Sequence, residues 1–114
     1  MASGIENTYW RSENGMKITL KEILSICKKK KIYLQKINLE WIYKNIELVK
    51  VSDKERIENV NLNYPIVILK MNEKEKVLDG NHRLAKAKLY NMKYIFAYII
   101  KISDIPSEKQ KIFL

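Results

Sequence analysis

The fold of this chain is decided by the stretch Lys76-Val77-Leu78-Asp79-Gly80-Asn81-His82-Arg83-Leu84-Ala85-Lys86-Ala87. The apolar pair Val77 and Leu78 predicts a strand, and the run from Leu84 to Tyr90 predicts a helix. Asp79-Gly80 lies between the two, so a strand-to-helix turn is expected there. The stretch also holds the only His of the chain and one of its three Arg residues.

The residue types at this turn suit an anion. The start of a helix presents unpaired backbone N–H groups and a partial positive charge. Gly80 has no Cβ and allows close backbone approach, and Arg83 adds a planar cationic fork that matches phosphate or carboxylate. An ordinary structural explanation stays open beside this one. Asp79 could cap the helix, His82 could pack like any partly buried His, and Arg83 could pair with a surface Glu.

The run Asp79-Gly80-Asn81-His82-Arg83, followed by Ala85, Ala87 and Asn91-Met92-Lys93, resembles the signature helix of the ParB/sulfiredoxin-like superfamily. The resemblance covers about residues 64–100 well and residues 32–62 more weakly. It implies an α+β fold with a small mixed sheet flanked by helices.

The same resemblance implies that the turn holds the phosphates of a nucleotide. Gly80 and Arg83 would contact phosphate, with Asn81 and His82 beside it. Phosphate hydrolysis or transfer would be the leading activity, with Mg²⁺ arriving on the nucleotide. Asp79, His82 and Glu40 would then be the candidate catalytic groups, with acid–base roles for the first two.

Two departures from the family limit which activity the resemblance implies. The sulfiredoxin branch has its nucleophilic Cys directly before the His-Arg pair, where this chain has Asn81, and the only Cys, Cys27, is far away in sequence. ParB partition proteins have Glu-Arg-Arg after the Gly and a Pro-Arg box after the first strand. Here the segment after that strand reads Asn38-Leu39-Glu40-Trp41. Neither sulfiredoxin chemistry nor a DNA-sliding clamp is therefore expected.

Charge and composition leave three classes of function open. A net charge of +9 and a pI near 9.6 favour a nucleotide, a nucleic acid or an acidic protein face as the partner. The alternatives are therefore a nucleic-acid-binding protein or nuclease, and a phage or mobile-element interaction or inhibitor protein that keeps the fold without catalysis. One Cys and one His are too few for a zinc site. No membrane-spanning run or signal core is present, so a cytoplasmic protein without a membrane partner is expected.

Local patterns predict the remaining elements. Residues 1–15 are expected to form a flexible arm, with Tyr9-Trp10-Arg11 docked on the domain or free for a partner, and residues 16–114 a single domain. Capping boxes at Thr19–Glu22 and Ser52–Glu55 predict helices from about Leu20 and Asp53. Strands are expected over residues 32–39, 64–70, 76–78 and 94–100, the last buried on both faces. Trp41 is expected in the core and Tyr43 in surface packing, with a base-stacking platform as the alternative.

Overall fold

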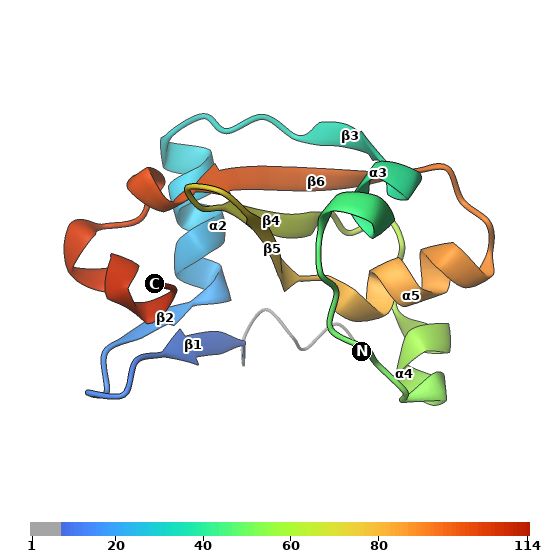
Figure 1. The fold of residues 1–114 in the computed structure, drawn as a ribbon, viewed down its shortest axis with the longest axis horizontal. Helices are drawn as coiled ribbons and strands as arrows, with labels where there is room; N and C mark the ends of the chain where they lie inside the picture. The colour runs from blue at the N-terminus through green and yellow to red at the C-terminus, as the bar shows by residue number, and fades with distance from the viewer. Residues whose placement is uncertain (1–7) are drawn as a thin grey trace.

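The chain folds around a four-stranded mixed sheet, shown in Figure 1. The structure is a computed structural model and describes residues 8–114. The strands of the sheet are β3 (Gln35–Asn38), β4 (Ile66–Lys70), β5 (Glu75–Asp79) and β6 (Tyr94–Lys101). Their order across the sheet is β3-β6-β4-β5, with β4 and β6 parallel and the other neighbours antiparallel. The α+β class and the mixed sheet predicted from the sequence are confirmed.

Helices cover opposite faces of this sheet. They are α2 (Leu20–Lys29), α3 (Leu39–Asn45), α4 (Lys54–Asn59) and α5 (Asn81–Leu89), with 3₁₀ segments η1 (Ile102–Asp104) and η2 (Ser107–Ile112). β4 alternates between two cores: Val67 and Leu69 join α2 and the C-terminal segments, whereas Ile66 and Ile68 join α3 and α5. Figure 1 shows α2 at one end of the strands and α3 and α5 at the other. Each face is therefore covered at only one end, which leaves part of each open.

The second half of the expected arm is structured. Strands β1 (Tyr9–Arg11) and β2 (Lys17–Thr19) pair antiparallel in a small hairpin. Trp10 docks on the C-terminal segment, its ring centroid 5.9 Å from that of Phe113. Docking of Trp10 is thus confirmed, and a flexible arm does not describe residues 8–15. The rest of that prediction falls on residues 1–7, which lie outside the described part of the chain.

The two predicted capping boxes have different outcomes. At α2 the box forms as expected: the Thr19 side chain accepts from the Glu22 N–H, and the Glu22 carboxylate accepts from the Thr19 N–H. At α4 the cap is Asp53 and not Ser52, because the Asp53 carboxylate accepts from the Arg56 N–H. Ser52 and Asp53 both have the short polar side chain that a cap position favours, and a carboxylate is the better partner for the positive end of a helix.

The hairpin from residue 64 to residue 79 is confirmed, but β6 differs from its prediction. β4 and β5 pair through a short turn, as the polar run Asn72–Glu75 indicated. β6 is not buried on both faces, because Tyr94 and Phe96 are 46% and 48% exposed. The α2 helix covers only the far end of that face. No helix among residues 8–114 is both long and apolar enough to span a bilayer.

Candidate functional site

Gly80 links the last strand residue of β5 to the first residue of α5. Its φ of +118° lies in the left-handed region, which side chains rarely adopt. A Cβ at this position would stand 2.7 Å from Ile66 Cβ and 3.3 Å from Arg83 Nη2. The glycine is therefore required by the approach of the turn to β4 and to the guanidinium of Arg83, whatever the turn binds.

Arg83 folds back from the first turn of α5 onto the end of β5. Its Nη2 donates to Asp79 Oδ2 at 2.5 Å, and the two side chains are 13% and 26% exposed. Asp79 is thus an ion-pair partner and not the expected helix cap, because the cap residue is Gly80 and no side chain caps α5. The sequence suggested a surface Glu as the structural partner of Arg83, and the structure gives it Asp79.

Two buried polar atoms at this turn have no hydrogen-bond partner among the described residues. They are Arg83 Nε, a donor, and Asn81 Oδ1, an acceptor. A buried polar atom without a partner costs about 1–3 kcal/mol, so such atoms are rare and call for an explanation. Both belong to the first turn of α5, where the backbone N–H groups also lack intrahelical acceptors.

His82 is the second residue of α5, and its ring is close enough to the start of α4 to feel the charges there. Burial lowers the pKa of its imidazole from the ordinary 6.5, and the charges of Arg56 and Arg83 lower it further, whereas Asp53 opposes them. The ring is therefore neutral at pH 7 and can both donate and accept a hydrogen bond. Sequence reasoning missed Arg56 and Asp53, because the whole β4–β5 hairpin separates them from the motif in the sequence and they carry no functional pattern of their own.

Glu40 is not brought to the turn by any contact that the structure shows. It lies in the first turn of α3, with its side chain 72% exposed, and its Oε1 is 2.8 Å from Lys44 Nζ. The hydrogen bond from Lys44 lowers the pKa of the Glu40 carboxyl. The turn therefore unites Asp79, Gly80, Asn81, His82 and Arg83 of the predicted set, and Glu40 stays apart.

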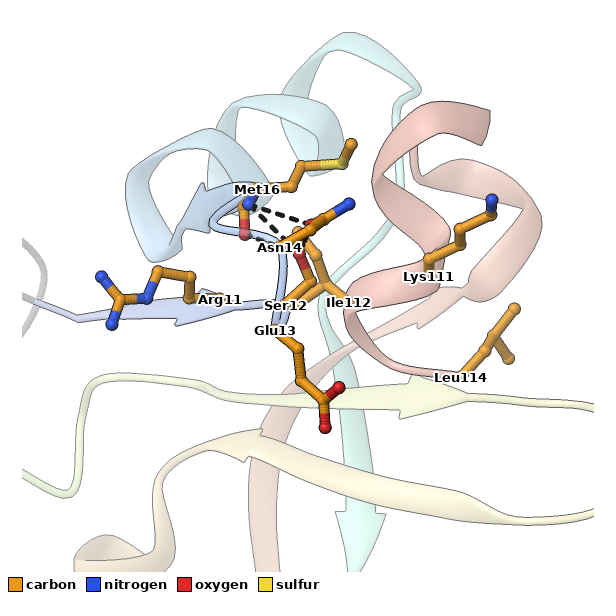
Figure 2. Close-up of a pocket in the computed structure, with 8 residues that line it drawn as sticks. All are labelled: Arg11, Ser12, Glu13, Asn14, Met16, Lys111, Ile112 and Leu114. Atoms are coloured by element: carbon orange, nitrogen blue, oxygen red, sulfur yellow. Dashed lines mark hydrogen bonds between the residues drawn. The ribbon is translucent and has the colours of Figure 1, made fainter.

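Two hollows on the described surface lie away from this turn. The first, of about 590 Å³, is lined by the β1–β2 loop and the end of the chain. Figure 2 shows Arg11, Glu13 and Lys111 around it pointing in three different directions, so they share no centre that a ligand could occupy. The second, of about 430 Å³, has a floor of Ile37, Ile68 and Ile99.

Trp41 departs from its prediction, whereas the surface packing expected for Tyr43 is confirmed. Trp41 borders the second hollow and is 43% exposed, so it is not a core residue. Tyr43 packs on α5. Its hydroxyl donates a hydrogen bond of 3.4 Å to the Leu84 carbonyl oxygen, and Lys88 Nζ lies 5.3 Å from the centroid of its ring. Its ring is therefore occupied by the protein, and Tyr43 is no free stacking surface.

The described residues contain no group of three His, Cys, Asp or Glu side chains that could hold a metal ion. Comparison with known proteins adds no relative from which a role could be transferred. No protein-family model matches the chain, and no curated protein matches its sequence.

Proposed function

We propose that the turn between β5 and α5 binds a nucleotide or another phosphorylated small molecule. The observation that carries the proposal is that two buried atoms of the first turn of α5, Arg83 Nε and Asn81 Oδ1, have no partner among the described residues. A ligand that pairs with both would remove a cost that the free protein bears. The same turn offers the uncapped start of a nine-residue helix, which favours negative charge.

The two unpartnered atoms define the chemistry of the ligand. Arg83 Nε needs an acceptor, which a phosphate oxygen supplies in a strong charge-assisted bond. Asn81 Oδ1 needs a donor, which a fully ionised phosphate does not have but a sugar hydroxyl has. A phosphate with a hydroxyl-bearing group attached therefore fits better than inorganic phosphate. A nucleotide is the commonest molecule of this kind, and the resemblance to ParB/sulfiredoxin-like proteins forms part of the same proposal.

We propose binding and not turnover as the function of the turn. Of the carboxylates expected to act in catalysis, Asp79 is held by Arg83 and Glu40 by Lys44. His82 is the one remaining candidate of that set, and its role in the proposal is to hydrogen-bond the ligand in its neutral form. Any Mg²⁺ would be carried by the phosphates of the ligand.

Calorimetric titration with ATP, CTP, GTP and ADP, with and without Mg²⁺, tests the proposal. Arg83→Lys keeps the charge beside Asp79 but removes the Nε donor, so we expect it to weaken binding at least about tenfold. Arg56→Lys is the matched control, because Arg56 is an exposed cation near the same turn, and we expect it to change affinity less than about threefold. Equal affinity of Arg83→Lys and the parent protein, or no binding of any nucleotide, would contradict the proposal.

Asn81→Asp separates loss of binding from loss of fold. The change keeps the shape of the side chain but places a negative charge where the phosphate is proposed to lie, so binding should be lost. The new charge also meets the positive start of α5, but it stands where Asn81 Oδ1 is buried without a partner among the described residues, so we expect the variant to be no more stable than the parent. Thermal unfolding of the variant checks that it stays folded. A folded variant that still binds nucleotide would show that the ligand lies elsewhere.

A further inference from the structure

One face of the β3–β6 strand pair carries exposed aromatic and basic side chains. Lys36 pairs directly with Phe96 across the two strands, and Asn38 pairs with Tyr94. Directly paired residues of an antiparallel ladder point to the same side, so these four share one face, here called the β3–β6 aromatic face. All four are exposed, whereas Ile95 and Ala97, on the opposite side of β6, are buried.

The charge of this face is positive. Lys36 is its basic residue, and β3 and β6 contain no acidic residue, within a chain of net charge +9; Lys101, at the end of β6, lies on the opposite side with Ile95 and Ala97. Lys36 Nζ lies 4.8 Å from the centroid of the Tyr94 ring, so cation and ring form one surface. Solvent-exposed rings beside a lysine, with no acid in either strand, favour a partner that has both flat apolar groups and negative charge.

We propose that the β3–β6 aromatic face binds single-stranded nucleic acid, with bases stacked on Tyr94 and Phe96 and a phosphate beside Lys36. Stacking on aromatic rings next to basic residues is how many proteins hold single strands without reading their sequence. Tyr98, the next side chain on this face of β6, is half-buried against the core and marks where the face ends.

The spacing of the rings selects a single strand over a duplex. Residues two apart in a strand are separated by about 6.6–6.8 Å. Stacked bases in B-DNA rise by about 3.4 Å, so two rings at this spacing hold neighbouring bases only if the strand is extended and unstacked. A duplex cannot offer its base faces without unpairing, and it is therefore left with charge attraction alone.

This site is separate from the α5 turn. It uses no residue of the turn, and in the sheet order β3-β6-β4-β5 the strand that leads to the turn lies at the opposite edge from β3. Arg83→Lys should therefore leave oligonucleotide binding unchanged, and substitutions on the β3–β6 aromatic face should leave nucleotide titrations unchanged. The two proposals can fail independently.

Fluorescence anisotropy with labelled dT and U oligonucleotides and a matched duplex, over a range of salt concentrations, tests the proposal. We expect tighter binding of the single strands than of the duplex. Tyr94→Ala and Phe96→Leu should each weaken single-strand binding by roughly 5-fold to 150-fold, with the slope of log affinity against log salt unchanged, because the phosphate contacts remain. Lys36→Gln should instead reduce that slope by about 0.7, the value for one lost phosphate contact on a single strand.

Tyr90→Ala is the matched control. Tyr90 is 57% exposed and has Lys86 Nζ 5.7 Å from its ring centroid, but it lies at the end of α5 and off the sheet. Its removal should not change affinity, and thermal unfolding confirms that each variant is folded. Unchanged affinity in Tyr94→Ala and Phe96→Leu, or equal affinity for single strand and duplex, overturns the proposal. So does a self-associated parent protein that binds no oligonucleotide and that Phe96→Leu dissociates in sedimentation.

Discussion

The starts of α2 and α5 differ in how their unpaired backbone N–H groups are satisfied. At α2 the Thr19 hydroxyl and the Glu22 carboxylate satisfy backbone N–H groups reciprocally, and Lys109 Nζ holds the carboxylate at 2.7 Å. At α5 the cap is a left-handed glycine, no acid lies in the first turn, and two buried atoms of that turn lack partners within residues 8–114. Both helices pack on the same sheet, so the difference is not one of burial.

This contrast shows where the chain completes its own hydrogen bonds and where it leaves them open. A capped start such as that of α2 offers a ligand little, because its donors and its positive end are already used. At the start of α5 no side chain uses the backbone N–H donors or the positive end of the helix, and the Asp79 carboxylate holds a guanidinium in place beside them. The unsatisfied end is therefore the one at which a ligand gains most.

Gly80→Ala should break the α5 start and have the largest effect. The added Cβ would meet Ile66, and the positive φ adds a backbone penalty, so we expect a loss of about 2–5 kcal/mol in the free energy of unfolding. Gly15→Ala is the matched control, with a φ of +89° but no atom within 4 Å of the new Cβ. It should cost only about 1–2 kcal/mol. Urea unfolding measures both, and equal losses would refute the close packing of Gly80 on Ile66.

Thr19→Ala should make the α2 start resemble the uncapped start of α5. Losing the side-chain acceptor for the Glu22 N–H should cost about 1 kcal/mol of unfolding free energy. Ser25→Ala, at an exposed position in the middle of the same helix, should be neutral or slightly stabilising, since Ala is the better helix former. If the two substitutions had the same effect in urea unfolding, the capping box would contribute nothing.

The pH dependence of the free energy of unfolding should show the smallest effect, through His82 at the start of α5. The pKa of His82 is lower in the folded state than its ordinary 6.5, so the unfolded chain takes up this proton first as the pH falls. The stabilising contribution of neutral His82 is complete above about pH 6.5 and is lost as the pH drops toward the folded-state pKa. His82→Gln should remove this part of the decline in urea unfolding between pH 7 and pH 5. An identical pH profile in parent and variant would place the ring in open solvent.

Sequence reasoning predicted the parts of the fold that rest on local pattern. The apolar runs of β4 and β5, the turn between them and the Thr19–Glu22 box each depend on residues within a few positions. The hairpin of β1 and β2 was missed because it is held from outside, by the packing of Trp10 against Phe113 at the far end of the chain. Exposure of Phe96 was missed for a similar reason, since it depends on where α2 stops covering the sheet.

The sequence allowed us to predict which residues form the candidate turn, but not which partners they contact. Gly80, Asn81, His82 and Arg83 are four consecutive residues, and the residue types alone indicated an anion. The pairing of Arg83 with Asp79 follows from the three-dimensional packing. So does the environment of His82, which burial and the charges of Arg56 and Asp53, at the start of α4, determine. Contacts between residues so far apart in the sequence leave no periodic pattern from which they could be predicted.

The place of β6 in the sheet bears on how the protein forms during synthesis. β6 is the partner of both β3 and β4, yet it is made last of the four strands. At about 5–20 residues per second, a ribosome needs several seconds between producing β3 and producing the strand that β3 pairs with. During that interval the edges of β3 and β4 that later meet β6 are unpaired on the nascent chain. The sheet can then close only after translation has passed residue 101.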